Sequence, residues 1–193
     1  VMQSVNRLLV DSVHLEFDKL QVLQSAYITA QTGRVTGVLG RNGCGKSSLI
    51  KAILGKTENM ELCGNFAVAP NLVISYINQD TSFLHGNIKD FCRERSLDES
   101  LFCAILRQLD MERVQFVKNM EDYSEGQKKK VLIAASLMTS AHLYIWDEPL
   151  NYIDVFSRMQ IEKLLETYAP TMLIVEHDVR FREKIASKVV EFG

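Results

Sequence analysis

Residues 40–47 read Gly40-Arg41-Asn42-Gly43-Cys44-Gly45-Lys46-Ser47. This stretch matches the phosphate-loop pattern G-x-x-x-x-G-K-[ST] at every position. An apolar run at 35–39 precedes it and a helical pattern at 46–54 follows it, which is the strand–loop–helix context that the pattern requires. Glycines permit the tight backbone that turns several N–H groups inward, and a helix N-terminus attracts an anion. The sequence therefore predicts a nucleotide site here.

The lysine and serine that end this loop have separate expected roles. We expect Lys46 to face solvent and reach the outer phosphates, and the Ser47 hydroxyl to ligand Mg²⁺. Cys44 has two interpretations, as a small residue that fills a slot or as a redox-sensitive thiol at a helix N-terminus.

The rest of the chain alternates between strand and helix patterns, which is typical of an α/β protein. Short apolar runs at 35–39, 143–146 and 172–175 predict buried parallel strands. Helices are predicted at 46–54, with Gly55 as C-cap, and at 155–168 and 179–187. Residues 7–17 and 20–31 predict two strands around a turn, and 86–122 a helical lobe whose second helix is capped by Ser96 or Asp98.

The composition excludes several classes of protein. Of the 193 residues, 47% are apolar and 24% charged, which excludes wholesale disorder. A formal net charge of −2 argues against a uniformly basic nucleic-acid binder. The sequence has neither an apolar run of membrane-spanning length nor a signal-peptide pattern. The four cysteines form no C-x-x-C pair, so free thiols in a reducing cytosol are expected.

Two adjacent carboxylates, Asp147 and Glu148, end the apolar run at 143–146. Ligands of α/β proteins bind at the carboxyl ends of strands. Asp147 can orient Mg²⁺ through water, and Glu148 can polarise an attacking water as a general base. A charged turn after a strand is the simpler alternative, and the upstream phosphate loop favours the catalytic interpretation.

Further motifs follow in a fixed order, and with them nearly the whole chain resembles an ABC-type ATPase domain. The features that match, after the phosphate loop, are Gln79 at the Q-loop, Tyr123-Ser124-Glu125-Gly126-Gln127 at the L-S-G-G-Q signature, Asp147-Glu148-Pro149 at Walker B, Asn151-Tyr152-Ile153-Asp154 at the D-loop, His177 at the switch histidine, and Phe17 at the aromatic residue that stacks on adenine.

The resemblance implies ATP and Mg²⁺ as cofactors, Glu148 and His177 as catalytic residues, and Ser47, Gln79 and Asp147 as the Mg²⁺ site. The ATP contacts that it implies are Phe17, Gly40, Arg41, Asn42, Gly43, Cys44, Gly45, Lys46, Ser47, Ser48, Gln79, Ser124, Gly126, Gln127 and Asp154. It also implies a P-loop NTPase fold of the ABC type: a mainly parallel sheet flanked by helices, an N-terminal antiparallel β portion and a small inserted helical lobe.

Two signature positions depart from the family pattern, because Tyr123 replaces leucine and Glu125 replaces the first glycine. In the family, the serine and the second glycine contact the γ-phosphate of a nucleotide on the opposite domain. Ser124 and Gly126 retain both groups. A carboxylate at 125 would repel that phosphate unless it points away.

The sequences of residues 146–155 and 124–130 resemble those of the ABC-F group, in particular its ribosome-protection branch associated with antibiotic resistance. Such proteins are cytoplasmic, carry two ATPase domains in one chain and act on ribosomes. Only 45 positions separate Gln79 from Ser124, too few for the arm that first domains usually hold, which favours the second, C-terminal domain.

The expected organisation is one ABC domain over 1–193, excised from a longer two-domain chain and monomeric without nucleotide. Its nucleotide-binding core covers about 1–85 and 123–193, and its helical subdomain covers 86–122. An ATPase subunit of a membrane transporter is the alternative function, since it would share every catalytic residue. Lys128, Lys129 and Lys130 form either a solvated helix start or a contact with ribosomal RNA.

Overall fold

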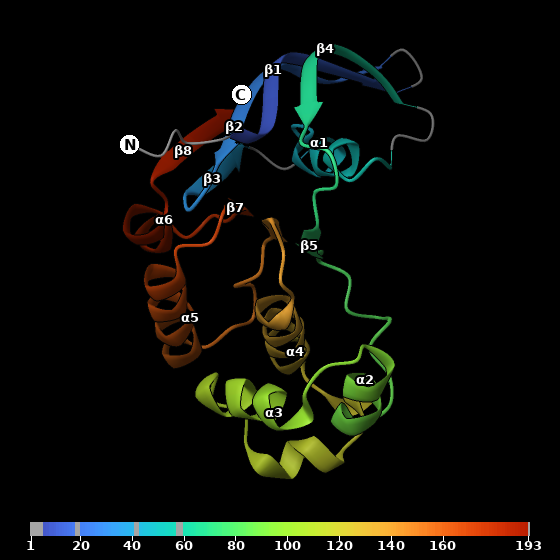
Figure 1. Ribbon diagram of the computed structural model, residues 1–193, viewed down its shortest axis with the longest axis vertical. Coiled ribbons are helices and arrows are strands. Elements are labelled where there is room, and N and C mark those ends of the chain that lie inside the picture. Colours follow the sequence, from blue (N-terminus) through green and yellow to red (C-terminus); the bar gives the residue numbers. More distant parts are fainter. Residues whose placement is uncertain (1–5, 18–19, 41–42, 57–59, 193) are drawn as a thin grey trace. The chain divides into compact units, whose positions relative to one another are not determined.

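The computed structural model describes residues 6–17, 20–40, 43–56 and 60–192 (Figure 1). Their backbone groups into two compact units. Unit 1 holds the described residues within Val1–Ser75, Ala141–Asp147 and Ala169–Gly193, and unit 2 holds Tyr76–Ser140 and Glu148–Tyr168. The chain therefore passes from unit 1 to unit 2 twice, after Ser75 and between the two adjacent carboxylates, Asp147 and Glu148.

A five-stranded sheet lies in unit 1 except for Tyr76 and Ile77, the last two residues of β5, which belong to unit 2. Its strand order is β5 (Ile74–Ile77), β6 (Leu143–Asp147), β7 (Met172–Val175), β3 (Val35–Gly40) and β8 (Lys188–Phe192). The pairs β6–β7, β7–β3 and β3–β8 are parallel. All four residues of β7 are buried, as are Ile145 and Trp146 of β6. Continuous apolar runs form such strands because helices or other elements cover both faces of a parallel sheet.

A second, antiparallel sheet has the order β2-β1-β4. It consists of β1 (Asn6–Phe17), β2 (Leu20–Gln31) and β4 (Met60–Val68). The first two strands match the prediction to within a residue. β4 was not predicted, because Cys63-Gly64-Asn65 interrupts any run of strand-forming side chains.

Two helices of unit 1 follow strands of the parallel sheet, α1 (Lys46–Ile53) after β3 and α6 (Val179–Ile185) after β7. Gly55 follows α1 with φ of +72°, as its expected role at the helix end requires. α6 ends two residues before the predicted position. The reason is that Ser187 donates its backbone N–H to the Val35 carbonyl at 2.9 Å, which starts β8 beside β3.

Unit 2 is helical. Its elements are α2 (Ile88–Glu94), α3 (Glu99–Gln108), the 3₁₀ turns η1 (Arg113–Val117) and η2 (Met120–Asp122), α4 (Glu125–Met138) and α5 (Val155–Tyr168). Of the two predicted caps, Asp98 caps α3 by accepting from the Leu101 N–H at 2.7 Å. Ser96 instead ends the preceding helix, with φ of +53°. The rings of Phe91 and Phe102 join α2 and α3 at 5.7 Å between centroids.

Candidate functional site

The parallel register of unit 1 brings three predicted site segments to one edge of the sheet. Val38 of β3 lies opposite Val175 of β7, and Val175 lies opposite Asp147 of β6. The carboxyl ends of the three strands therefore lie in one row. The phosphate loop, Asp147 and the segment that carries His177 all start from this row, which is where α/β proteins bind ligands.

Two glycines of the phosphate loop are required by its geometry. Gly40 and Gly45 have φ of +151° and +95°. A Cβ at Gly40 would lie 2.5 Å from the Cys44 Sγ and 2.7 Å from the Phe192 carbonyl oxygen. The Cys44 thiol thus occupies the space beside Gly40, which supports its interpretation as a slot-filling residue. Arg41 and Asn42 lie outside the described residues.

The expectation that Lys46 faces solvent is wrong. Lys46 is 7% exposed, and its Nζ donates to the Gly40 carbonyl at 2.7 Å. The carbonyl of Gly40, at the end of β3, accepts from this ammonium, and the aliphatic stem of Lys46 is buried. Lys46 is therefore bonded to the backbone of the loop that it follows.

Oxygen ligands suitable for Mg²⁺ are present in unit 1. Ser47 is exposed in the first turn of α1, Ser48 beside it is half-buried, and Asp147 is 4% exposed at the end of β6. Hydroxyl and carboxylate oxygens are the hard donors that Mg²⁺ prefers. This donor set fits the predicted metal.

The exposed His177 stands on a turn built by a residue that the sequence analysis missed. The buried Glu176 carboxylate accepts the backbone N–H groups of His177 at 2.8 Å and Asp178 at 3.2 Å. Asp178 then caps α6 by accepting from the Phe181 N–H at 2.9 Å. An acid directly after an apolar strand was the available signal for Glu176, since a buried carboxylate requires such hydrogen bonds.

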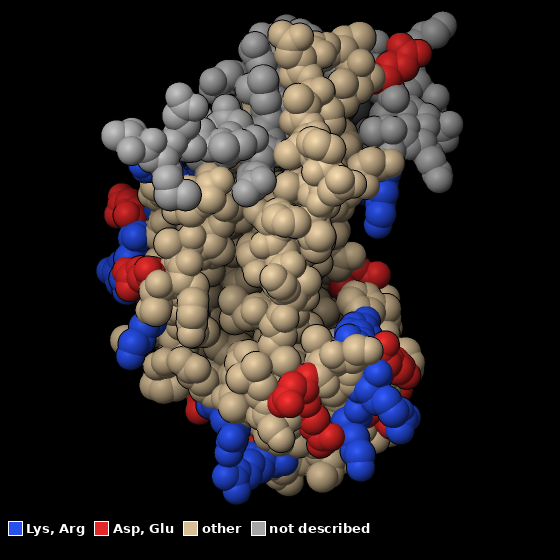
Figure 2. All heavy atoms as spheres, viewed as in Figure 1, with Lys and Arg blue, Asp and Glu red and all other residues tan. Residues whose placement is uncertain are grey.

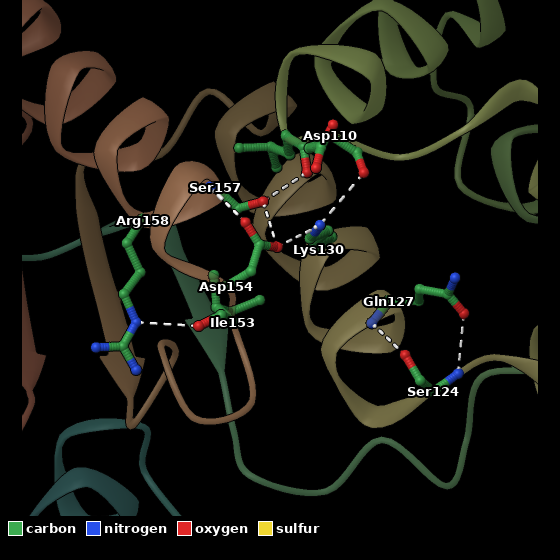
Figure 3. A network of polar contacts seen from close by, with 9 residues as sticks. Asp110, Ser124, Gln127, Lys130, Ile153, Asp154, Ser157 and Arg158 are labelled. Carbon is green, nitrogen blue, oxygen red and sulfur yellow. Dashed lines mark hydrogen bonds and ion pairs between the residues drawn. The ribbon is translucent and has the colours of Figure 1, made fainter.

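In unit 2, Ser124 and Gln127 form a capping box at the start of α4 (Figure 3). The Gln127 N–H donates to the Ser124 Oγ at 3.3 Å, and the Ser124 N–H donates to the Gln127 Oε1 at 3.0 Å. The box uses the serine hydroxyl as an acceptor, so its O–H hydrogen can still donate to an anion. The Gln127 amide oxygen acts as a cap.

Gly126 lies against the D-loop. A Cβ at this position would collide with the backbone carbonyl oxygen of Tyr152, which itself has φ of +67°. Glycine at 126 is thus required within unit 2 itself, because no side chain fits between α4 and the turn at 150–153.

Asp154 ties α4 to α5 (Figure 3). Its Oδ2 lies 2.8 Å from the Lys130 Nζ and accepts from the Ser157 hydroxyl at 2.7 Å, while its Oδ1 accepts from the Ser157 N–H at 2.8 Å. Burial alone would raise the pKa of Asp154, but the bonds from Lys130 and Ser157 outweigh it and hold that pKa well below its ordinary value. Arg158 donates to the carbonyls of Leu150 at 3.1 Å and Ile153 at 3.1 Å, which fixes the D-loop turn.

Two of the three lysines at 128–130 match neither expected interpretation. Lys129 is 3% exposed and donates to the Asn78 carbonyl at 3.0 Å, and the buried Lys130 pairs with Asp154. Lys128 lies 3.2 Å from the Glu125 carboxylate. All three ammonium groups therefore have an acceptor within unit 2, and the two buried ones, Lys129 and Lys130, face neither water nor RNA. Lys128 remains partly exposed, so neither interpretation is tested for it.

The remaining predicted site residues are placed as follows. Gln79 is exposed after β5, and Glu148, with φ of +48°, accepts from the Asn151 amide at 2.8 Å. Tyr123 is buried, its hydroxyl donates to the Gln115 carbonyl at 2.6 Å, and burial raises its pKa to about 12. The backbone of Phe17 ends β1, and its side chain lies outside what the structure describes.

Comparison with known proteins decides the family. The model of the family described as "ABC transporter" matches residues 23–151, more than half of the chain. The chain belongs to the ABC transporter family. It is an ABC ATPase domain, and such domains bind ATP with Mg²⁺ and hydrolyse it.

Several curated proteins resemble this ABC ATPase domain. Ribosome protection protein VmlR of Bacillus subtilis (strain 168) is 31% identical over 94% of this chain and 33% of its own length. ATP-binding protein Uup of Buchnera aphidicola subsp. Acyrthosiphon pisum is 30% identical over 93% and 31%. Zinc import ATP-binding protein ZnuC of Buchnera aphidicola subsp. Schizaphis graminum is 26% identical over 88% and 74%. The domain spans about a third of the first two relatives.

A solved structure described as the ATP binding subunit of an ABC transporter superposes with a TM-score of 0.80, covering 96% of this chain and 85% of that one at 22% identity. The predicted fold class, a P-loop ABC ATPase with a mainly parallel sheet flanked by helices, is confirmed. None of the described helices combines the length and apolar character of a membrane span.

Replacing Lys46 with methionine keeps the buried stem and removes the ammonium. We expect ATP affinity to fall at least about a hundredfold, because the outer phosphates lose their charged donor. Binding of a fluorescent ATP analogue measures this. Lys51→Met, an exposed substitution in the last turn of the same helix, is the control and should bind normally. Unchanged affinity in Lys46→Met would contradict the phosphate-loop assignment.

Glu148→Gln should bind ATP normally and hydrolyse it about 10²–10⁴ times more slowly, the usual effect of removing a general base. His177→Ala should also slow hydrolysis. The double variant should be slowed by less than the product of the two single effects, because both residues act in one step. Single-turnover phosphate release gives the rates. Glu166→Gln, an exposed change on α5, is the matched control. Near-normal turnover in Glu148→Gln would assign the base elsewhere.

Proposed function

We propose that this ABC ATPase domain is part of a cytoplasmic ABC-F protein that acts on the ribosome and protects it against an antibiotic. The observation that supports this most is the likeness to ribosome protection protein VmlR over 94% of the chain. Arabidopsis thaliana ABC transporter F family member 2 is also similar, at 26% identity over 91% of the chain. Both similarities agree with the ABC-F-like sequences around Trp146 and Ser124.

The alternative is the ATPase subunit of a membrane transporter. ZnuC supports it, because this chain covers 74% of that import protein's length. The catalytic machinery does not separate the two functions, so only the partner distinguishes them.

On the face drawn in Figure 2, charge does not identify an RNA-binding surface. Figure 2 shows Lys and Arg side chains lying beside Asp and Glu side chains over the helices α2 and α3. RNA-binding surfaces gather basic residues on one face. The proposal that this protein acts on the ribosome therefore rests on its similarity to ABC-F relatives and on the sequences of its motifs.

Within the site, we propose that Lys46 and the backbone of the phosphate loop hold the phosphates of ATP. Ser47, Gln79 and Asp147 are the proposed Mg²⁺ site, and Glu148 and His177 the proposed catalytic pair. The proposed contacts to the rest of the nucleotide and to a second domain are Phe17, Ser48, Ser124, Gly126, Gln127 and Asp154.

A second ABC domain of the same chain is the proposed partner that completes each site. An apolar face next to the D-loop supports this proposal. Tyr152, Val155, Phe156 and Met159 recur at helical spacing and are 77%, 74%, 52% and 58% exposed. Contiguous exposed apolar side chains mark interaction surfaces. Ser124 and Gly126 lie close by in unit 2, since Gly126 touches Tyr152.

Co-sedimentation of the full-length natural protein with ribosomes tests the proposed function. We expect the Glu148→Gln variant to pellet with ribosomes in the presence of ATP and to remain in the supernatant without nucleotide, because ATP that is bound and not hydrolysed holds the ribosome-binding state. Lys46→Met with ATP is the matched control and should not pellet. ATP-independent behaviour of both variants would favour the transporter alternative.

Dilution of the isolated domain tests the composite site. Two copies must meet by diffusion, so specific ATPase activity should fall over a hundredfold dilution, and the nucleotide-free domain should be monomeric. Phe156→Ser should lower activity further at every concentration. Tyr168→Ser, which changes a side chain 73% exposed at the other end of α5, should not. A high activity that survives dilution would show that one domain holds a complete site.

A further inference from the structure

Glu125 introduces a negative charge where the proposed function requires attraction for phosphate. It is the first residue of α4, between Ser124 and Gly126. Backbone N–H groups at a helix start attract carboxylates as well as phosphates. A free Glu125 carboxylate could therefore turn back onto the start of α4 and repel a nucleotide there.

Both oxygens of this carboxylate are held elsewhere. The Thr81 hydroxyl donates to the Glu125 Oε2 at 2.8 Å, and the Lys128 Nζ lies 3.2 Å from the Oε1. Thr81 is 5% exposed, so its hydroxyl has few alternative partners in water. The hydrogen bond from Thr81, followed by that from Lys128, lowers the pKa of Glu125, which keeps the carboxylate ionised and paired.

The segment that carries Thr81 is itself attached to α4. The buried Lys129 donates to the Asn78 carbonyl at 3.0 Å, one turn along the helix from Glu125. Two bonds, Lys129 to Asn78 and Thr81 to Glu125, therefore bracket Gln79 and Asp80. With its segment fixed in this way, the Thr81 hydroxyl keeps one position relative to Glu125.

We propose that Thr81 is a positioning residue that, together with Lys128, holds the Glu125 carboxylate aside from the phosphate-facing start of α4. The inference rests on the proposed function, in which Ser124 and Gly126 face the nucleotide of a second ABC domain. A chain with glycine at 125 needs neither partner. In this chain the glutamate is tolerated because its charge is paired within unit 2.

The test is a charge-specific rescue in the full-length natural protein, read as kcat and KM for MgATP. Thr81→Val is nearly isosteric and removes only the hydroxyl. We expect it to raise KM about five- to tenfold, with kcat within about twofold, because the released carboxylate repels the nucleotide. Glu125→Gln should leave KM close to the parent value. The double variant Thr81→Val/Glu125→Gln should return KM to that value, since no charge remains to be released.

A purely structural role for Thr81 predicts the opposite, because Glu125→Gln does not restore the missing hydroxyl. Thr139→Val is the matched control at the C-cap of α4: the Thr139 hydroxyl donates to the Ala135 carbonyl at 2.9 Å, and its removal should not affect KM. If the melting temperature shows that Thr81→Val does not fold, Lys128→Met replaces it and should show the same rise and the same rescue by Glu125→Gln.

A parental KM in the variant that folds, or a raised KM that Glu125→Gln does not restore, would overturn the inference. The proposed function fails by a different result: the isolated domain would keep a high specific ATPase activity over a hundredfold dilution, so no second domain would face Ser124 and Gly126.

Discussion

Val38, Val175 and Asp147 lie in one row across three parallel strands, and the candidate site of unit 1 depends on that row. Parallel pairing makes neighbouring strands end at the same edge, so segments more than a hundred residues apart in sequence start from adjacent points. The row also explains the burial of Asp147, which is 4% exposed because it still belongs to β6. The following residue, Glu148, already belongs to unit 2. The two adjacent carboxylates thus have different surroundings, which suits a division between holding a metal ion and activating water.

In unit 2, the arrangement of the candidate site residues depends on the start of α4. Gly126 contacts the Tyr152 carbonyl, Lys130 pairs with Asp154, and Ser157 links Asp154 to the Leu109 carbonyl at 2.8 Å. The signature segment and the D-loop are therefore one structural body within this unit. Lys130 is buried and the Asp154 side chain is 46% exposed, so removing Asp154 would leave a buried ammonium without its charged partner, which is destabilising. The pairing of Lys130 with Asp154 therefore ties α4 to α5.

The sequence was sufficient for features that depend on local pattern. The strand bounds of 20–31 and 172–175 and the helix bounds of 155–168 agree with β2, β7 and α5, because apolar periodicity and turn residues determine them. It was insufficient where a partner from a distant segment decides. Lys46 was expected to face solvent, and Lys129 to face either solvent or ribosomal RNA. Each is buried against a backbone carbonyl that no local pattern reveals. Glu176 was missed for the same reason, since its role consists of bonds to backbone N–H groups.

The two departures from the signature pattern are each matched by a partner. Tyr123 is larger and more polar than leucine, and its hydroxyl would be costly to bury without the bond to the Gln115 carbonyl at 2.6 Å. Glu125 carries a charge that glycine lacks, and Thr81 and Lys128 bond it. All three partners lie in unit 2, so each substitution is compensated inside the unit that carries it. Ser124 and Gly126, which retain the family's residues, have different constraints: one is fixed by a capping box and the other by contact with the D-loop. The signature of this chain therefore keeps its backbone geometry through internal contacts, and that geometry, more than the consensus letters, is what a bound phosphate would meet.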